Sequence, residues 1–318
     1  MTAENKHTIE DLKIMQSWSL ERKIRVTQTR IMEWYMHYNG NVYVSFSGGK
    51  DSTVLLDLAR RIYPDIPAVF VDTGLEYPEI KEFVKSQDNI TILRPKKIFR
   101  QVVLEYGYPV ASKEIAKKIY YYKKGSEWTK KYIEKTAIDK QNRLSRYCIS
   151  ERWLKLVDAP FKVSSYCCDV MKKQPLHSFS KKTGAKPIVG TMAGESLLRT
   201  RHWLYAGCNS FENKHQISKP MSFWTEQDVL QYLKQFNIPY CSVYGDIVEN
   251  TKGKLYTTKC DRTGCVFCGF GCTLEKSPNR FQSLKQTHPK LHEYCMKPID
   301  AGGLGMKEVL DYIGVPYE

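Results

Sequence analysis

Residues 42–52 read VYVSFSGGKDS, and this stretch decides the fold. Val42–Phe46 is a short run of β-branched and aromatic residues, which is typical of a buried strand. A Gly-Gly turn follows it, and from Asp51 to Ile62 the apolar residues recur at helical spacing. Glycines let a backbone approach an anion, a helix start offers unpaired N–H groups, and Lys50 adds a full positive charge. Strand, loop and helix together predict a phosphate-binding loop.

Strands and helices continue to alternate beyond this loop. Helical spacing predicts two helices between Ile9 and Tyr38, before the first strand. After the loop we expect buried strands at Ala68–Val71, Ile90–Leu93 and Pro187–Gly190, and helices at residues 77–86 and 225–236. Such alternation predicts an α/β fold, with a doubly wound and mostly parallel sheet covered by helices on both faces.

Three regions are expected along the chain. Residues 1–40 would form the N-terminal helices, and residues 41–245 the nucleotide-binding α/β domain. A basic helical insertion is expected within that domain at about residues 111–155. Residues 246–318 are rich in turns and cysteines, and we expect them to pack on the main domain.

Positive charge is concentrated in the insertion. The chain has a formal net charge of +15, and residues 111–155 hold 13 Lys or Arg against five Asp or Glu. Aromatic and cationic side chains are interleaved there, as in Tyr120–Lys124, Trp128 and Lys130–Tyr132, with Arg143 and Arg146 beyond. Stacking and phosphate contacts require this combination, so the insertion predicts a nucleic-acid partner, tRNA or DNA. A solvated helical hairpin with a partly buried aromatic face is the alternative.

Membrane association is not expected. No apolar run approaches the about 20 residues that span a bilayer, and Met1–Lys6 lacks the apolar stretch of a secretion signal. We therefore expect a cytoplasmic protein. The sequence makes no prediction of oligomeric state.

Six of the ten cysteines fall into two groups. Cys167 and Cys168 are adjacent, and the second group is Cys260, Cys265, Cys268 and Cys272. In a reducing compartment, clustered thiols indicate metal ligands or redox groups rather than disulfides. Four thiolates suit a [4Fe–4S] cluster, with zinc as the competitor. Spacing alone leaves open whether both groups share one site, whether the second group forms a local quartet, or whether no metal binds.

The loop resembles the pyrophosphate loop of the adenine-nucleotide α-hydrolase superfamily, whose members cleave ATP between the α and β phosphates. Its spacing differs from that of ordinary P-loop NTPases. The resemblance implies that ATP is held by a continuous run of residues: Ser45, Phe46, Ser47, Gly48, Gly49, Lys50, Asp51 and Ser52. Asp51 and Asp72 both follow strand ends, where ligands bind open parallel sheets, so we expect them near Mg²⁺ and the phosphates. Lys50, Asp51 and Asp72 are the predicted catalytic residues.

Further segments narrow the resemblance to the phosphoadenosine phosphosulfate reductase family. Asp72-Thr73-Gly74 resembles an Asp-Thr-Gly segment of these reductases, and Gly190–Arg199 resembles their Gly-Xaa-Arg-Xaa-Xaa-Glu-Ser-Xaa-Xaa-Arg segment, with Met192 in place of the usual arginine. A Trp-Thr helix follows at Trp224-Thr225. The resemblance covers roughly residues 42–270. It implies further nucleotide contacts from Asp72, Thr73, Gly74, Gly190, Glu195 and Arg199.

The cysteines extend this resemblance. Cys167-Cys168, followed by Lys172, Lys173 and a Pro-Leu pair, is similar to the Cys-Cys segment of assimilatory adenylylsulfate reductases, and their Cys-Xaa-Xaa-Cys pair corresponds to Cys265 and Cys268. The resemblance therefore implies a [4Fe–4S] cluster, or zinc, bound by Cys167, Cys168, Cys265 and Cys268. The local quartet and the absence of metal remain alternatives.

Two features differ from the reductases. Their Glu-Cys-Gly-Xaa-His segment is absent from this sequence, in which no cysteine follows Cys295. The loop also keeps Lys50, which the reductases tend to lose, and this favours ATP. The combination resembles enzymes that adenylate an oxygen and then install sulfur, such as tRNA thiolases and the sulfur-activating subunit of DNA phosphorothioation, with Mg²⁺ and a sulfur-donor protein or reductant. The alternatives are a sulfonucleotide reductase that uses Cys272 or Cys295, and a non-catalytic nucleotide-binding or nucleic-acid-binding protein.

Overall fold

A six-stranded sheet forms the centre of the fold in the computed structural model, which describes residues 5–212 and 216–318. The strand order is β3-β2-β1-β5-β7-β6. Neighbouring strands are parallel except for the pair of β6 and β7. The strands are β1 (Val42–Ser45), β2 (Ala68–Val71), β3 (Ile90–Leu93), β5 (Lys186–Val189), β6 (Asn209–Ser210) and β7 (Ile217–Ser218). The predicted doubly wound, mostly parallel α/β fold is confirmed.

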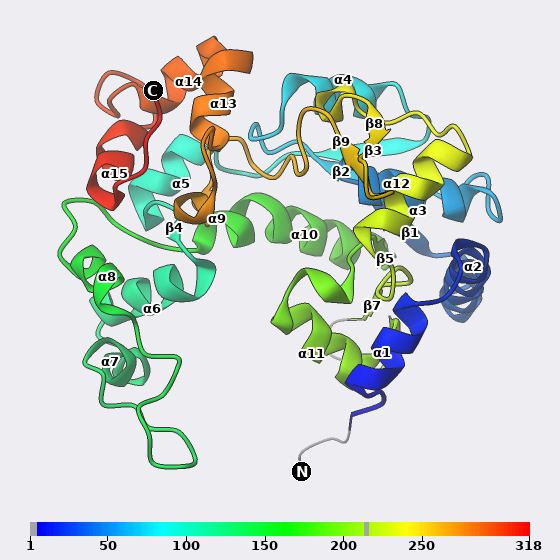
Figure 1. Cartoon of the computed structure of the whole chain (residues 1–318), viewed down its shortest axis with the longest axis horizontal. Helices are drawn as coiled ribbons and strands as arrows, with labels where there is room; N and C mark the ends of the chain where they lie inside the picture. The colour runs from blue at the N-terminus through cyan, green and yellow to red at the C-terminus, as the bar shows by residue number, and fades with distance from the viewer. Residues whose placement is uncertain (1–4, 213–215) are drawn as a thin grey trace. The chain divides into compact units, whose positions relative to one another are not determined.

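Helices alternate with these strands along the chain, as Figure 1 shows by its colour sequence. They are α1 (Ile9–Gln16), α2 (Leu20–His37), α3 (Lys50–Arg60), α4 (Pro78–Lys85), α11 (Leu197–Ala206) and α12 (Glu226–Gln235). The core between helices and sheet contains Trp34, Trp203 and Trp224, all at most 1% exposed. These elements agree with the predicted helices and strands to within a few residues.

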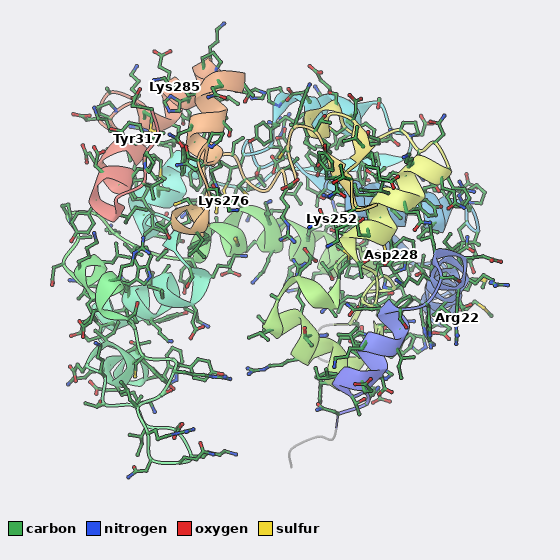
Figure 2. All side chains as sticks on the ribbon, in the orientation of Figure 1. Arg22, Asp228, Lys252, Lys276, Lys285 and Tyr317 are labelled. Atoms are coloured by element: carbon green, nitrogen blue, oxygen red, sulfur yellow. The ribbon has the colours of Figure 1, made fainter. Side chains whose placement is uncertain are left out.

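A capping box forms the start of α12. Thr225 Oγ1 accepts the Asp228 N–H, and Asp228 Oδ2 accepts the Thr225 N–H at 2.7 Å. Asp228, labelled in Figure 2, also forms a buried ion pair with Lys23 of α2, with Nζ and Oδ2 2.6 Å apart. The Asp228 carboxylate thus caps α12 and also links this helix to α2.

The chain divides into two compact units. The first contains residues 1–72, 76–93 and 176–263, and the second contains residues 73–75, 94–175 and 264–318. The first unit holds the six-stranded sheet and a hairpin of β8 (Ile247–Glu249) and β9 (Leu255–Thr257). Residues 246–263, which the sequence analysis groups with the C-terminal region, belong to the first unit.

The second unit is mainly helical. It contains α5 (Phe99–Tyr106), α6 (Lys113–Lys123), α7 (Glu127–Ile133), α8 (Glu151–Leu154), α9 (Tyr166–Cys168), α13 (Arg280–Thr287), α14 (Pro289–Met296) and α15 (Met306–Ile313). Helices α6, α7 and α8 lie within the basic segment of residues 111–155, and this segment belongs to the second unit, not to the unit that holds the phosphate loop. A short parallel pair, β4 (Val110–Ala111) with β10 (Gly269–Phe270), joins two distant parts of this unit. Across the described residues, every helix is too short or too polar to cross a bilayer.

Candidate functional site

The predicted phosphate loop lies at the carboxyl end of β1. Phe46 is buried, and its N–H donates to Val69 O of β2 at 2.9 Å, which fixes the strand end. Gly48 has a φ of +71°, and a Cβ there would lie 2.9 Å from the side chains of Ile80 and Val84 in α4. Only glycine fits both the backbone conformation and this close approach. Gly49 then precedes α3 as its N-cap.

Hydroxyl oxygens face the N–H groups of the loop. The Ser47 N–H donates to Ser52 Oγ at 3.1 Å, and the Gly49 N–H donates to Ser47 Oγ at 3.4 Å. The Lys50 N–H donates to Tyr244 Oη at 3.3 Å. Three N–H groups of the loop thus face oxygen atoms, the kind of acceptor that a phosphate would also present.

Lys50 is buried and points away from open solvent. Its Nζ lies 2.6 Å from Glu226 Oε1 and 2.6 Å from the carbonyl oxygen of Asp261. The same ammonium lies 5.5 Å from the ring centroid of Tyr244. Sequence reasoning missed Glu226, Asp261 and Tyr244 as neighbours of the loop. From the sequence, the acidic first turn of α12 could be explained by the dipole of its own helix alone. Glu226 is 176 residues from Lys50, so nothing in the sequence links the two.

Asp51 has an unusual environment for a carboxylate. Its Oδ1 is buried and has no hydrogen-bond partner among the residues that the structure describes. Burial raises the pKa of Asp51, although the adjacent Lys50 acts in the opposite direction. A buried, unpartnered carboxylate oxygen is costly unless a cation or a donor completes it. Asp51 therefore fits the predicted role of a Mg²⁺ ligand.

Asp72 follows β2 and pairs with Lys81 of α4, with Oδ1 and Nζ 2.7 Å apart. Lys81 follows Ile80, which packs against Gly48 of the loop. Thr73 Oγ1 accepts the Leu75 N–H at 3.2 Å, and Gly74 has a φ of +76°. Asp72 belongs to the first unit, whereas Thr73 and Gly74 belong to the second.

The segment after β5 reaches the loop helix through Gly190. A Cβ at Gly190 would lie 3.0 Å from the Asp51 carbonyl oxygen, so a side chain there would push the two segments apart. Glu195 accepts the Met192 N–H at 3.0 Å and forms an ion pair with Arg199. Burial, with the charge of Arg262, lowers the pKa of Arg199.

A basic cluster beside Arg199 was not predicted. Lys219 Nζ lies 3.1 Å from His202 Nδ1. Burial, together with the charge of Arg199, lowers the pKa of Lys219 to about 8. Arg199, Arg262 and Lys219 thus place several cationic groups in the unit that contains the loop. Their spacing in the sequence carries no motif that would have identified them.

The four cysteines predicted as ligands line one small cavity in the second unit. Its volume is about 20 Å³. It is lined by Leu75, Phe99, Pro109, Cys167, Cys168, Met171, Lys172, Cys265 and Cys268. Nevertheless, among the residues that the structure describes, no three His, Cys, Asp or Glu side chains converge as a ready-formed metal site.

Local backbone structure directs these thiols. Cys167 and Cys168 end a short helical turn that continues as a π-helix at Asp169–Lys173. Such a widened turn changes the direction of neighbouring side chains and is frequent at functional sites. Cys265 and Cys268 form a tight turn, in which the Cys268 N–H donates to Cys265 O at 3.1 Å.

The thiols differ in acidity. A hydrogen bond from Cys167, with the nearby charges of Lys113 and Lys172, lowers the pKa of Cys168 to about 6. Burial raises the pKa of Cys268 to about 11. Positive charge beside a thiolate favours metal binding, and the basic side chains near Cys168 supply it.

Cys260 and Cys272 do not line this cavity. Cys260 belongs to the first unit, and its thiol donates to Arg262 O at 3.0 Å. Cys272 is buried, and its thiol donates to Gly269 O at 3.0 Å. The two cysteine pairs, rather than the local quartet, share a cavity.

The basic insertion combines buried and exposed cations. Lys118 is 4% exposed, bonds Glu114 Oε1 at 2.6 Å and lies 4.9 Å from the ring centroid of Tyr132, so it is structural. The other lysines of α6 and α7 are exposed, and so are Trp128 at 51% and Tyr147 at 40%. The insertion therefore presents cations and two large aromatic rings to solvent.

Comparison with known proteins gives one family match and several relatives. The family model described as "Phosphoadenosine phosphosulfate reductase domain" matches residues 41–270. An uncharacterised protein of Methanocaldococcus jannaschii is 24% identical over 92% of this chain, but the match spans only 55% of that protein. An adenosine 5'-phosphosulfate reductase of Staphylococcus haemolyticus is 26% identical over 67% of this chain and 70% of its own.

Among solved structures, the phosphoadenylyl-sulfate reductase of Candida auris is 14% identical. It covers 79% of this chain and 99% of its own, with a TM-score of 0.40. The family match includes the phosphate loop, the Gly190–Arg199 segment and both cysteine pairs. The chain therefore belongs to the phosphoadenosine phosphosulfate reductase domain family.

Proposed function

We propose that this protein cleaves ATP between its α and β phosphates to adenylate an acceptor oxygen, in preparation for sulfur transfer. The complete loop carries this proposal: a parallel strand leads into Ser-Gly-Gly-Lys-Asp-Ser, and within this loop the buried Oδ1 of Asp51 lacks a hydrogen-bond partner among the described residues. A loop of this form at a helix start is suited to binding phosphates, and a divalent cation would complete the coordination of the Asp51 carboxylate.

Individual residues would divide the work. Loop N–H groups would hold the phosphates in place of the Ser47, Ser52 and Tyr244 oxygens that they contact here. The acceptor oxygen would bond to the α-phosphorus as the bond to pyrophosphate breaks. Asp51 and Asp72 would bind Mg²⁺, which offsets charge on the phosphates. Lys50 would leave Glu226 and stabilise the departing pyrophosphate.

The cavity of Cys167, Cys168, Cys265 and Cys268 would hold the metal centre. Four thiols on one cavity, with Lys172 beside them, are a donor set suited to a [4Fe–4S] cluster. Because the cavity has a volume of only about 20 Å³, loading would require the side chains to move apart. A sulfur-donor protein or a reductant would complete the reaction, and the exposed cations of the insertion favour a nucleic acid as acceptor.

Product analysis tests the proposal. Anaerobically purified protein, incubated with α-labelled ATP, Mg²⁺, bulk tRNA or DNA and inorganic sulfide as the nucleophile that displaces AMP from the adenylated acceptor, should release AMP and pyrophosphate. Lys50→Ala and Asp51→Asn should abolish this release, whereas Lys252→Ala, at an exposed position on the β8–β9 turn, should not. Release of ADP and phosphate, or equal turnover in the loop variants, would reject the proposal.

A sulfonucleotide reductase is the second candidate, because relatives of this chain carry that name. The loop lysine argues against it, but the basic cluster of Arg199, Arg262 and Lys219 could bind a sulfate group. Incubation with adenylylsulfate or phosphoadenylylsulfate and a thiol reductant decides between the two. Sulfite formation without ATP consumption would establish the reductase.

Metal analysis tests the cysteine assignment separately. The protein isolated without oxygen should be brown, with iron and sulfide in near-equal amounts. Cys168→Ser, Cys265→Ser and Cys268→Ser should lose both, while Cys260→Ser and Cys272→Ser retain them. Zinc without sulfide would refute the cluster, and metal loss on changing Cys260 or Cys272 alone would move the site to the local quartet.

A further inference from the structure

A second cavity lies in the second unit and plays no part in the loop or the cysteine site. Its volume is about 370 Å³, within the range of small-ligand pockets. It is lined by Glu105, Tyr106, Ile119, Tyr120, Lys123, Lys124, Leu156, Val157, Ala159, Pro160, Phe161, Lys162 and Val163. All of these residues belong to one unit.

The lining is apolar inside and cationic outside. Ile119, Leu156 and Val163 are at most 4% exposed, whereas Lys123 and Lys124 are exposed. Lys124 Nζ lies 5.9 Å from the ring centroid of Tyr120, so one cation already sits beside an aromatic ring of the pocket. An apolar, aromatic pocket with exposed cations among its lining residues suits a flat heterocycle that carries a phosphate.

The aromatic wall of this cavity continues to the cysteine pair. Tyr106 stacks on Tyr166, with ring centroids 5.1 Å apart and planes at 8°. Tyr120 also packs on Tyr166, at 4.8 Å. Tyr166 directly precedes Cys167 in the same helical turn. Tyr166 thus packs against two aromatic lining residues of this cavity and is the sequence neighbour of Cys167, although it lines neither of the two cavities itself.

We infer that this cavity binds an unstacked base of a single-stranded nucleic acid, with the flanking phosphates on Lys123 and Lys124. This inference rests on the proposed function, because it names the acceptor class for the sulfur transfer. Extruding a base is the usual way in which enzymes reach atoms that stacking would hide. A free nucleotide also offers a base and a phosphate. A strand has a phosphate on each side of the base, however, so it can contact both exposed lysines at once.

Binding of a short fluorescent single-stranded DNA tests the inference without ATP. Its counterpart is an oligomer of equal length in which every base is replaced by an abasic spacer, so that only phosphates remain. The unmodified protein should bind the base-containing strand roughly tenfold more tightly, as expected for base–aromatic stacking. Ala159→Trp and, separately, Val157→Phe should fill the cavity and remove this preference while leaving the affinity for the abasic strand unchanged.

Matched controls make the test decisive. Ala301→Trp adds the same ring at an exposed position of the same unit and should keep the preference. The double variant Lys123→Gln with Lys124→Gln should weaken the binding of both strands by the same factor. Equal affinity for the two strands in the unmodified protein, or a preference that survives both filled-cavity variants, would overturn the inference. So would competition by free AMP at concentrations equal to those of the strand.

ATP cleavage is measured independently of this binding. If the loop releases AMP and pyrophosphate but the base preference is absent, the base pocket fails and the proposed function stands. If the preference is present and ATP is not cleaved, the proposed function fails and the cavity remains a binding site for single strands.

Discussion

At the residue scale, Lys50 is held by a protein carboxylate at the position where a phosphate is expected. Its ion pair with Glu226, at 2.6 Å, means that ATP must compete with that side chain. Glu226 is about half exposed, so it can turn into solvent when a phosphate arrives. The pair therefore keeps a buried cation neutralised while no nucleotide is bound.

This competition predicts opposite effects for the two partners. Lys50→Ala should weaken ATP binding about tenfold to a hundredfold, as loss of a charge-assisted contact of about 1.5–3 kcal/mol implies. Glu226→Gln should tighten binding, because the lysine loses its competing partner. Lys234→Ala, exposed on the same helix as Glu226, is the control. Calorimetry measures all three, and an unchanged affinity in Lys50→Ala would remove the lysine from the site.

Lys219 gives a pH-dependent prediction. Burial, with the charge of Arg199, lowers its pKa to about 8, below the value of 10.5 of an ordinary lysine. The unfolded chain therefore binds more protons than the folded chain between these two values, and this group makes stability rise with pH across that window. Lys219→Met should remove this rise.

Chemical denaturation at several pH values between 8 and 10.5 measures it as the difference between the two proteins. Taking the difference is necessary because buried thiols such as Cys268, with a pKa raised to about 11, change stability in the opposite direction at high pH. A difference that does not vary with pH would show that Lys219 titrates as an ordinary lysine.

At the element scale, the buried ion pair of Asp228 and Lys23 at the start of α12 stabilises the first unit. Asp228 caps its own helix and neutralises the buried Lys23 of α2. Lys23 Nζ also donates to Gln16 O at 2.7 Å, so three segments meet at one ammonium. Removing one member of a buried pair leaves an uncompensated charge.

Asp228→Asn should therefore destabilise the fold by about 3–5 kcal/mol, as for other broken buried pairs. Thr225→Ala, which removes the cap and the hydroxyl's hydrogen bond to Asp228 but leaves both charges in place, should cost about 1 kcal/mol. Lys23→Met combined with Asp228→Asn should recover most of the loss, because no buried charge remains. Urea denaturation measures the series. If the double variant were less stable than Asp228→Asn alone, the charge would not be the cause.

The elements themselves were largely predictable from the sequence. The period of apolar residues located α1 to α4 and strands β1, β2, β3 and β5, because each buries one face or both. Strands β6 and β7 are only two residues long and leave no periodic signal. The π-helix after Cys168 was also hidden, since a widened turn depends on packing rather than on local preference.

At the scale of the whole molecule, the net charge of +15 is unevenly distributed, and the insertion holds a large share of it. For single-stranded nucleic acid, the logarithm of affinity should fall with the logarithm of salt concentration by about 0.7 per phosphate contacted. Lys130→Glu with Lys131→Glu should reduce this slope, but should leave the preference for bases over abasic spacers intact.

Anisotropy titrations over a range of salt measure the slope. The same double reversal at Lys290 and Lys307, exposed lysines of the second unit outside the insertion, is the control. An equal loss of slope in both variants would mean that net charge alone, rather than the insertion, binds the strand.

The candidate sites were predictable only in part at this scale. A contiguous segment such as residues 45–52 can be recognised from the spacing of its Ser, Gly and Lys residues, and its strand–loop–helix form was predicted. Glu226, Tyr244 and Lys219 come from other segments of the first unit, and each looks ordinary in its own sequence context. The large cavity was hidden for the same reason, because α6 and the segment around residues 156–163 meet only in the folded chain.

The pairing of β4 with β10 also determines an order of events during synthesis. These strands are separated by about 160 residues, yet β10 directly follows Cys268 and fixes its turn. At about 5–20 residues per second, the ribosome makes β4 roughly 10–30 seconds before its partner exists. Cys167 and Cys168 would therefore be exposed thiols in the nascent chain for several seconds before Cys265 and Cys268 are made. Loading of the proposed metal centre would therefore follow translation of this region, and cells would need to keep the early pair reduced until the later pair emerges.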